Sequence, residues 1–558
     1  MGRNIMGKPI SPPLRTDPIP NIDSKSGYDT VTGIYHSKFL PIDLPSNPFL
    51  DIVTHIFYLN RGTRKALVNA STGRSLTYED LYGRVRAAAA GLSQIGIGHG
   101  DVVMIVAPNS IENVVAMLAV MFAGGVVTSA NPVSTVSEIA NQVKDSNPKL
   151  IVTIRQLVGK VVSFQLPLLL LGADQTPPTI STALPTFFFS HLLSSDPNKL
   201  PAFRFHQRDT AALFYSSGTT GLSKGVIISH RNLIAATTQM EQQGPDEVET
   251  YLSIVPTFHI YGFSQVTCAT LRMGHTIVIM PQFDFEQMLV AIERYRVTIL
   301  PIVPPIVNLL IKSSLASKYD LTSLKLVASG GAPLNKEVSD AFAERYPHVI
   351  FRQAYALTET CCIGTMPNME DTQHQGSVGL LWATLKAKVV DVETGRCLPP
   401  NAKGELWLHG PSITKGYLND QATTSTSFDA EGWLYTGDFV YFDKEGYLYV
   451  VDRIKELIKY KAFQVAPAEL EAILLQHPEI NDAAVIGYPD KDAGEIPMAF
   501  IVRSEKSTLS EDNIKAYIAQ QVAPYKKIRR VVFIDEIPKS AIGKTLRQEL
   551  VTLSTSKL

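Results

Sequence analysis

The chain is poor in cysteine, in net charge and in long apolar segments. Its four cysteines, Cys268, Cys361, Cys362 and Cys397, have no metal-type spacing in a sequence of 558 residues. This argues against a disulfide framework and favours a reducing compartment. The formal net charge is −1, so no global electrostatic field would attract nucleic acid or an anionic membrane. We therefore expect no nucleic-acid partner.

No segment predicts a membrane span or a secretory leader. The Pro-rich N-terminus lacks an apolar signal core. The uncharged stretch 114–130 is short and contains Gly124-Gly125, which favours a buried helix followed by a strand. The sequence ends in Ser556-Lys557-Leu558, which matches the address read by the peroxisomal import receptor. This predicts a peroxisomal protein, and the alternative is a frayed polar tail.

What the chain does have is a repeated β-α-β pattern. Its 45% hydrophobic and 18% charged content is typical of a globular enzyme, and its length predicts more than one domain. Thr77 and Asp80 have the spacing of a helix capping box. We expect strands at 101–107, 126–128, 149–154 and 211–214, helices at 115–122 and 138–144, and a surface connection at 174–201. The predicted fold class is α/β, with layered sheets covered by helices on both faces.

The last hundred residues predict a smaller α+β module. Helices are expected at 467–475 and 514–522, and strands at 483–486 and 498–502. The basic segment 452–461 precedes this module, and a charge run is usually a solvated face. At a domain junction it also fits a hinge beside a polyanionic ligand. We divide the chain into an N-terminal tail (1–32), a large domain (33–451), a hinge (452–455) and a C-terminal domain (456–558).

The segment 215–225, Tyr-Ser-Ser-Gly-Thr-Thr-Gly-Leu-Ser-Lys-Gly, has the composition of a phosphate-binding loop. Its glycines let a phosphate approach backbone N–H groups closely, and Lys224 adds a positive charge. The spacing is neither that of a Walker loop nor that of a Rossmann fingerprint. A flexible surface loop is the alternative reading.

Five further segments follow this loop in a fixed order: 354–360, 404–410, 435–438, 452–471 and 538–547. Together the six resemble the acyl-adenylate-forming superfamily, and within it the 4-coumarate–CoA ligase-like enzymes. The resemblance implies a large multi-sheet N-terminal domain and a small mobile C-terminal domain. It also implies that ATP, Mg²⁺ and CoA are used to convert a carboxylic acid first to an acyl-adenylate and then to a CoA thioester.

The resemblance assigns roles residue by residue. Lys544 matches the lysine of the adenylation step, Lys459 and Lys461 match residues of the thioester-forming step, and His259 matches a wall between nucleotide and acyl pockets. Glu359 matches the Mg²⁺-linked carboxylate. The implied ATP- or AMP-binding residues are Ser216, Ser217, Gly218, Thr219, Thr220, Gly221, Lys224, Gln353, Ala354, Tyr355, Thr358, Asp438, Arg453 and Lys455. The implied acyl-binding residues are Tyr261, Gly331, Ala354 and Met366, and the implied CoA-binding residues are Lys461 and Ala462.

Taken singly, several of these residues have plainer readings. Thr358-Glu359 could be a helix cap, Asp438 a turn residue, Lys544 an exposed lysine and His259 a buried structural histidine. The pair Cys361-Cys362 could hold a nucleophile, but no partner base is evident, so we expect it to line a pocket.

Departures from the family pattern bear on the substrate. Ala354 and Ala356 stand where the family has glycine, so we expect 4-coumarate to be a poor substrate. The segment 257–263 lacks the acidic residue of amino-acid-activating relatives, which favours a carboxylic acid with an apolar aromatic or aliphatic body. Two alternatives stay open, which are a luciferase-type adenylating oxidase and a catalytically silent paralogue that binds acyl groups or nucleotides.

Overall fold

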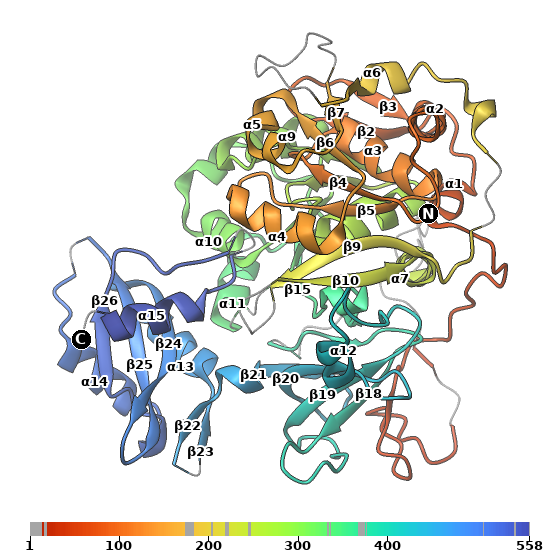
Figure 1. Ribbon diagram of the computed structural model, residues 1–558. Coiled ribbons are helices and arrows are strands. Elements are labelled where there is room, and N and C mark those ends of the chain that lie inside the picture. Colours follow the sequence, from red (N-terminus) through yellow and green to blue (C-terminus); the bar gives the residue numbers. More distant parts are fainter. Residues whose placement is uncertain are drawn as a thin grey trace, which may run out of the picture.

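A computed structural model shows a large multi-sheet body with a smaller C-terminal domain beside it (Figure 1). In Figure 1 this domain, coloured blue, joins the body through the strand labelled β21. The structure describes residues 14–15, 19–172, 184–201, 205–217, 223–243, 247–331, 334, 336–366, 374, 376–461, 463–505, 507–540 and 543–556.

The first sheet carries the predicted phosphate loop at its edge. Its order is β10-β9-β5-β4-β6-β7-β8, with bounds Ser223–Ser229, Thr210–Ser217, Val126–Ser129, Val102–Val106, Leu150–Ile154, Leu168–Leu171 and Thr186–Phe188. All neighbours are parallel except the β9–β10 hairpin. One face packs on α4 (Val136–Ser146) and α5 (Val158–Val161). The other packs on α2 (Tyr78–Gln94) and α3 (Ile111–Phe122).

The second sheet forms the floor of the candidate site. Its order is β15-β14-β13-β11-β12-β2-β3, with bounds Ile350–Gln353, Leu326–Ser329, Ile299–Ile302, Thr250–Ser253, Thr276–Ile279, Lys65–Asn69 and Ser75–Thr77. Leu300 and Val327 point to the outer face, where they pack on α9 (Phe285–Tyr295), α10 (Pro304–Lys312) and α11 (Lys336–Arg345). Because strand side chains alternate, Ile299 belongs to the inner face, where it clusters with Tyr251.

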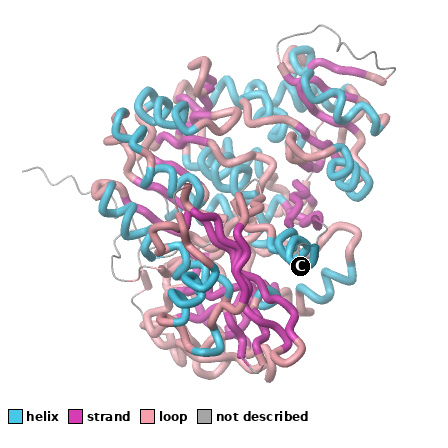
Figure 2. Tube along the Cα trace, turned by 90° about the vertical axis from the view of Figure 1, so that its left-hand side faces the viewer, coloured by secondary structure: helices cyan, strands magenta, loops and turns pink. Residues whose placement is uncertain are grey.

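Helices fill the space between these two sheets. They are α1 (Ile52–Phe57), α7 (His230–Gln243), the π-helix η4 (Tyr261–Ala269) and α8 (Thr270–Met273), in addition to α2 and α3. Figure 2 shows the same arrangement from the side, with helices on and between the strands. Short 3₁₀ turns connect other elements at Arg155–Leu157, Val162–Phe164, Pro197–Lys199 and Ser314–Lys318.

A third, antiparallel sheet closes the large body. Its order is β1-β18-β19-β20-β21, with bounds Tyr35–His36, Lys386–Val390, Gly404–His409, Leu434–Phe442 and Leu448–Arg453. Beside it lie α12 (Gln421–Ser427) and the pair β16 (Thr365–Met366) and β17 (Leu380–Leu381). Burial alternates along the whole of β20, and its buried face carries Thr436 and Asp438 as well as the core residues Leu434, Val440 and Phe442. Near the N-terminus, Tyr28 packs on Tyr35 of β1, with ring centroids 4.9 Å apart.

The C-terminal domain is a separate sheet with its own core. Its path is β23-β22-β25-β24, with β26 beside β25 and bounds Phe463–Val465, Ile458–Tyr460, Gly494–Arg503, Ile480–Asp490 and Arg530–Phe533. The helices α13 (Pro467–Leu475) and α14 (Glu511–Ala519) pack on one face, and α15 (Arg547–Ser556) packs on the other. The structure confirms the α/β class with a small α+β C-terminal domain.

Most predicted elements are present, and two predictions need correction. The helix predicted at 514–522 ends at Ala519, because Pro524 follows closely and begins a 3₁₀ turn, Pro524–Lys526. The surface connection predicted at 174–201 is wrong for its second half. There β8 adds an edge strand beside β7, and α6 (Phe189–Leu192) buries Phe189 and Leu192 in the main core. Residues 173–183 lie outside the described part.

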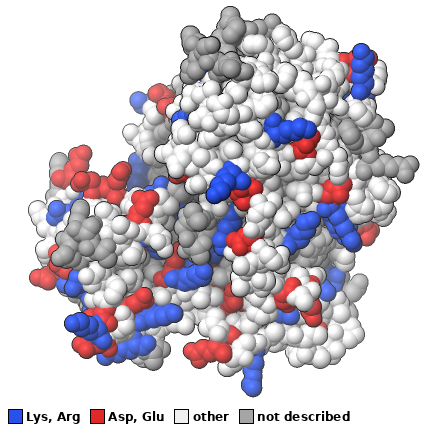
Figure 3. All heavy atoms as spheres, in the orientation of Figure 1, with Lys and Arg blue, Asp and Glu red and all other residues white. Residues whose placement is uncertain are grey.

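The apolar stretch 114–130 forms most of α3 and all of β5. Within the described residues, no helix has the length and apolarity that crossing a bilayer requires. On the face drawn in Figure 3, basic and acidic side chains are interspersed. This distribution agrees with the net charge of −1.

Candidate functional site

A cavity of about 940 Å³ lies where the carboxyl ends of the parallel strands meet the third sheet and the C-terminal domain. Ligands in open α/β sheets bind at this edge of the strands. Its walls include Lys224 from β10, Ala354 after β15, Thr436 from β20 and Lys544 from the C-terminal domain. Glu405 and Arg453 line it as well, so the cavity joins residues from all six sequence segments.

Glu359 lies at the centre of a polar cluster on one wall. It belongs to the short 3₁₀ turn η6 (Thr358–Thr360). Its Oε1 accepts hydrogen bonds from Ser216 Oγ (3.1 Å) and from the Tyr417 hydroxyl (2.9 Å). Lys224 pairs with Ser216 across the β9–β10 hairpin, and its Nζ lies 5.5 Å from the Tyr417 ring centroid. The cluster brings a cation, a carboxylate and two hydroxyls together at the base of the predicted phosphate loop.

Only part of that loop belongs to the described residues. Gly218, Thr219, Thr220 and Gly221 lie outside the described residues, and so does the side chain of Ser217. Thr358, which was predicted to contact phosphate, is buried and lines the cavity beside Glu359. Sequence reasoning missed Tyr417, although it lies in a segment, Lys415-Gly-Tyr-Leu-Asn-Asp420, between two of the recognised motifs.

Asp438 and Arg453 form a buried ion pair on adjacent strands. They face each other in the register of β20 and β21, and Arg453 Nε lies 3.0 Å from Asp438 Oδ1. Arg453 Nη1 also donates to the Thr436 carbonyl at 2.7 Å. Asp438 is only 4% exposed. Burial raises the pKa of its carboxyl, and Arg453 opposes this shift only in part. The two residues therefore converge as their sequence segments predicted.

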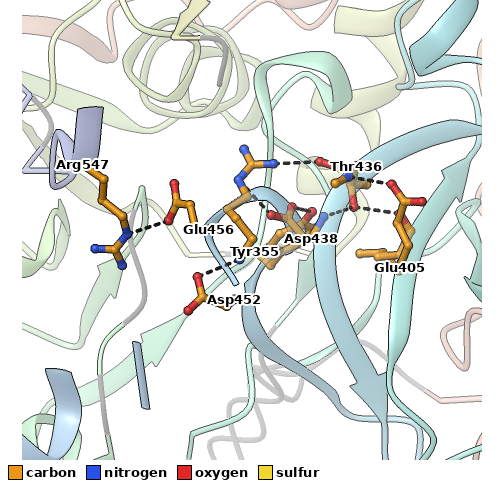
Figure 4. A network of polar contacts seen from close by, with 10 residues as sticks. Tyr355, Glu405, Thr436, Asp438, Asp452, Glu456 and Arg547 are labelled. Atoms are coloured by element: carbon orange, nitrogen blue, oxygen red, sulfur yellow. Dashed lines mark hydrogen bonds and ion pairs between the residues drawn. The ribbon is translucent and has the colours of Figure 1, made fainter. Parts of the chain in front are cut away.

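Tyr355 is bound to this pair (Figure 4). Its hydroxyl donates a short hydrogen bond to Asp438 Oδ2. Its backbone is held by Thr365, whose Oγ1 accepts from Tyr355 N at 3.1 Å. Burial raises the pKa of the phenol well above its ordinary value, so the hydroxyl stays protonated and donates. Glu405 holds the backbone just before Asp438, because its Oε1 accepts a hydrogen bond from Gly437 N at 3.0 Å.

Lys544 enters the cavity from the C-terminal domain. Its backbone N donates to Ser540 Oγ (3.2 Å), and Ser540 N donates back to its carbonyl (2.8 Å). Burial and the neighbouring Arg453 lower the pKa of its ammonium group. Lys455, just after β21, also lines the cavity. Lys455 of the predicted hinge and Lys544 of the C-terminal domain thus both line the cavity.

Lys459 and Lys461 lie elsewhere in this arrangement. Both are exposed, and neither is among the described residues that line the cavity. Lys459 belongs to β22, and its backbone N donates to Glu495 Oε2 at 2.8 Å. Lys461 follows with a positive φ of 52° and donates its N–H to the Ala493 carbonyl at 2.7 Å. Ala462 lies outside the described part.

Charged side chains also hold the junction between the two domains. Asp452 Oδ2 accepts from Ala468 N of α13 at 2.9 Å, and burial raises the pKa of this carboxyl to about 6. Arg547 at the start of α15 pairs with Glu456 (2.8 Å) and with Glu471 (2.7 Å). The segment leaving β21 is therefore tied to two helices of the C-terminal domain.

The other end of the cavity is mainly apolar. His259, Tyr261 and Gly331 line it together with Ala354, Ala356 and Cys362. His259 Nδ1 accepts from Tyr261 N at 3.2 Å, and burial lowers the pKa of the imidazole to about 4, so the ring is neutral near pH 7. The Tyr261 hydroxyl donates to the Ala328 carbonyl at 3.2 Å. The side chain of Met366 lies outside the described part.

The two adjacent cysteines differ in position. Cys362 lines the cavity, while Cys361 is buried in the main core. Burial raises the pKa of the Cys362 thiol to about 12 and that of Cys361 well above its ordinary value. Since the thiolate is the nucleophilic form, neither cysteine has the environment of a covalent catalyst.

Two residues of β15, Gln353 and Arg352, do not follow the sequence prediction of which residues line the site. Gln353 does not appear among the described lining residues. Its amide instead bonds the backbone of Leu334, accepting from N at 3.0 Å and donating to O at 3.2 Å. Arg352, which sequence reasoning missed, lines the cavity next to Ala328, and its Nη1 donates to the Phe351 carbonyl at 2.7 Å.

Comparison with known proteins now adds the family. The model of the AMP-binding enzyme family matches residues 59–418, and that of the AMP-binding enzyme C-terminal domain matches residues 469–544. The chain belongs to the AMP-binding enzyme family. This confirms the resemblance to the acyl-adenylate-forming superfamily and its 4-coumarate–CoA ligase-like branch.

Relatives of this AMP-binding enzyme match along nearly their whole length. A probable CoA ligase of Humulus lupulus is 47% identical, with 96% of this chain and 98% of the relative covered. Peroxisomal OPC-8:0-CoA ligase 1 of Arabidopsis thaliana is 45% identical, with 96% and 99% covered.

Among solved structures, ATP-bound MatB from Rhodopseudomonas palustris has a TM-score of 0.80 at 26% identity, covering 91% of this chain and 99% of MatB. The apo form of MatB gives a TM-score of 0.71 at 25% identity over the same shares. Over the whole chain, this AMP-binding enzyme is therefore more similar to the ATP-bound form of MatB than to the apo form.

Proposed function

We propose that this cavity carries out both half-reactions of an AMP-forming acid–CoA ligase on a carboxylic acid with an apolar body. The comparisons show that the chain is an ATP-dependent acid–CoA ligase of the 4-coumarate–CoA ligase-like branch. The class of acid and the roles of individual residues are our proposal. The observation that carries the proposal is one continuous cavity with a polar end at Lys224 and Glu359, Lys544 from the second domain, and an apolar end beyond His259.

In the first half-reaction, a carboxylate oxygen of the acid attacks the α-phosphorus of ATP. A new oxygen–phosphorus bond forms, the bond to the β-phosphate bridge breaks, and pyrophosphate leaves. Such a transfer needs positioning and neutralisation of charge more than covalent help. We assign the β- and γ-phosphates to Lys224 and the loop before it, the ribose hydroxyls to Asp438 and Arg453, and the reacting oxygens to Lys544.

Mg²⁺ fits the polar end of the cavity. Glu359 supplies one carboxylate there, and the described residues contain no group of three His, Cys, Asp or Glu side chains that could cage an ion. Mg²⁺ is commonly held by one or two carboxylates, with substrate phosphates and water completing the octahedron. When bound, the ion would neutralise phosphate charge. Ser216 and Tyr417 hold the Glu359 carboxylate through hydrogen bonds to its Oε1.

In the second half-reaction, the CoA sulfur attacks the acyl carbon, a thioester bond forms and AMP leaves with the carboxylate oxygen. We assign Lys459 and Lys461 to this step, with Ala462 beside the CoA path. Because these lysines are exposed here, the step requires the C-terminal domain to turn about 452–455. Tyr355 and Thr358 keep their proposed places at the nucleotide, and Tyr261, Gly331, Ala354 and Met366 keep theirs at the acyl group. We propose no direct contact for Gln353, whose amide bonds the Leu334 backbone outside the described cavity lining.

The test is a product analysis with purified full-length protein. We expect ATP to give AMP and pyrophosphate only with a carboxylic acid present, and a thioester only when CoA is added. Light or oxidised product without CoA would instead favour the adenylating oxidase. Binding of nucleotide with no turnover across a broad panel of acids would favour the silent paralogue.

We also propose that the protein is imported into peroxisomes. One relative is named a peroxisomal ligase, and the printed sequence ends in Ser556-Lys557-Leu558. A fluorescent protein fused before Met1 should enter peroxisomes, and deletion of these three residues should leave it in the cytosol. An unchanged peroxisomal signal after the deletion would contradict the proposal.

A further inference from the structure

The apolar end of the cavity is a tunnel that runs along the second sheet. Its sheet wall is built from every second strand residue, Ile299 and Pro301 on β13 and Leu326 and Ala328 on β14, ending at Gly330. This alternation is that of one sheet face. The opposite wall comes from Tyr261, Gln265 and Val266 of η4 and from Met240 of α7. The tunnel therefore lies between the sheet and the helices packed on its inner face.

The tunnel is long relative to a compact acid. Leu326 and Gly330 are four residues apart on one extended segment, which spans about 13 Å at the usual rise of about 3.3 Å per residue. Four residues of extended backbone contain twelve chain bonds, so an extended acyl chain of roughly ten to twelve carbons covers the same span. A shorter or more compact acyl body would leave the far end of the tunnel empty.

One apolar cluster lies at the far end of the tunnel, and it contains one polar atom, the hydroxyl oxygen of Tyr251. Tyr251, Ile299 and Leu326 are neighbours in the register of β11, β13 and β14, and they cluster with Met240 and Met273. Tyr251 is 7% exposed and lines the cavity, and its ring stacks on His275 with centroids 5.6 Å apart. Among the described residues, no group forms a hydrogen bond with its hydroxyl.

This hydroxyl differs from the other phenol of the tunnel. Tyr261, nearer the reacting end, donates to the Ala328 carbonyl. Burial raises the pKa of Tyr251 above its ordinary value, so its hydroxyl keeps its proton and is available as a donor. Because Tyr251 lines the cavity, a ligand oxygen placed beside this hydroxyl would form a hydrogen bond with it.

We infer that the substrate is a monocarboxylic acid with an extended, medium-length apolar body and a hydroxyl or carbonyl oxygen at its far end, which Tyr251 binds. The inference rests on the proposed function, since the tunnel must open onto the adenylation site. In this inference Tyr251 is a specificity-determining residue, and the far end of the tunnel limits the length of the acyl chain.

The test compares acids that differ only at the far end or in length. ATP–pyrophosphate exchange would be measured with hexanoate, dodecanoate, ω-hydroxydodecanoate, dodecanedioate and 4-coumarate. We expect ω-hydroxydodecanoate to exceed dodecanoate in kcat/KM by about 5- to 20-fold, the size of one hydrogen bond. We expect hexanoate, dodecanedioate and 4-coumarate to be poorer than dodecanoate. Preference for the diacid would overturn the inference and point to Arg352.

Two variants locate the effect. Tyr251→Phe should bring the ratio of hydroxylated to plain acid close to one, with dodecanoate itself little changed. Leu326→Phe fills the far end of the tunnel, so it should reduce activity on dodecanoate and leave activity on hexanoate unchanged. Tyr346→Phe is the matched control, because this buried tyrosine of the same domain donates to the Leu310 carbonyl away from the tunnel.

The outcomes separate this inference from the function on which it rests. Activity with an unchanged ratio in Tyr251→Phe, or with no advantage for the hydroxylated acid, would overturn the inference and leave the ligase function standing. Failure of every acid to support exchange would refute the proposed function and the inference with it.

Discussion

The carboxylate of Glu359 is oriented by residues far from it in the sequence. Ser216 precedes it by 143 positions and Tyr417 follows it by 58, yet both donate to the same oxygen. The Tyr417 ring also lies under Lys224 Nζ. A cation over an aromatic face contributes about 0.5–2 kcal/mol. Tyr417 therefore acts as a positioning residue that sets both the carboxylate and the cation of the polar end.

Removing only the Tyr417 hydroxyl should weaken Mg²⁺ use. Tyr417→Phe keeps the ring under Lys224 but deletes one hydrogen bond to Glu359. A hydrogen bond to a charged group contributes about 1.5 kcal/mol or more, so the Mg²⁺ concentration for half-maximal pyrophosphate exchange should rise by about 10-fold. The rate at saturating Mg²⁺ should change less. The measurement is a Mg²⁺ titration of exchange at fixed ATP and acid.

Tyr441→Phe is the control for that titration. Tyr441 stacks on Tyr449 with ring centroids 4.9 Å apart, and neither ring is among the described residues lining the cavity. An equal Mg²⁺ requirement in wild type and Tyr417→Phe, or the same rise in both variants, would argue against a positioning role for the Tyr417 hydroxyl.

At the residue scale, the sequence predicted those site residues that belong to recognised motifs. Asp438, Arg453 and Lys544 could be named because each has a fixed place in a short segment. In the structure Arg453 and Lys544 line one cavity, and Asp438 is paired with Arg453. Tyr417 and Arg352 could not be identified in this way. Their contacts with the site arise from the packing of segments that are distant in the sequence, and one sequence carries no signal for such contacts.

At the scale of elements, the π-helix η4 is the feature that shapes the acyl tunnel. Its i→i+5 spacing places Tyr261 and Val266 on the tunnel wall, and π-helical turns frequently mark functional sites. The helix begins close to the preceding loop. A Cβ added at Gly262 would lie 2.1 Å from the Pro256 carbonyl oxygen. Only glycine fits there without a backbone shift.

Gly262→Ala should therefore both destabilise the large domain and impair acid activation. The clash is with backbone, so neither side can yield by a rotamer change, and overpacking of this kind costs about 1–3 kcal/mol. We expect a lower midpoint of thermal unfolding and a raised KM for the acid, with a smaller effect on KM for ATP. The measurements are a thermal melt and steady-state kinetics with each substrate varied.

Gly98→Ala is the matched control, because an added Cβ there meets no atom within 4 Å. It should leave the melting midpoint and both KM values unchanged. A wild-type melt and wild-type kinetics for Gly262→Ala would show that the close approach to Pro256 does not constrain η4.

Element prediction succeeded where local signals agree and failed where packing decides. The capping box at Thr77 and Asp80 and the apolar periodicity behind it predicted α2, which begins directly after Thr77. The segment around Phe189 was misread because Pro and Ser nearby favoured a loop, whereas its aromatic residues add an edge strand and a helix to the core. The π-helix has no sequence signal comparable to a capping box.

At the scale of the whole molecule, the arrangement of the two domains decides which of the predicted catalytic lysines lies at the cavity. Lys544 lines the cavity, whereas Lys459 and Lys461 are exposed and are not among the described residues that line it. The salt bridges of Arg547 with Glu456 and Glu471 hold α15 against the segment that leaves β21. The arrangement has the Lys544 side of the C-terminal domain at the site, which is the side that we propose for the first half-reaction. The turn about 452–455 stays a prediction.

The most direct test of this account measures the two half-reactions separately in Lys544→Ala, with Lys461→Ala as its counterpart. ATP–pyrophosphate exchange reports the first step, and thioester formation from a supplied acyl-adenylate and CoA reports the second. We predict that Lys544→Ala loses exchange by about 100-fold or more, as for removal of a preorganised charge, and keeps thioester formation, while Lys461→Ala shows the reverse. Equal loss of both steps in Lys544→Ala, or a Lys461→Ala variant defective only in exchange, would contradict it.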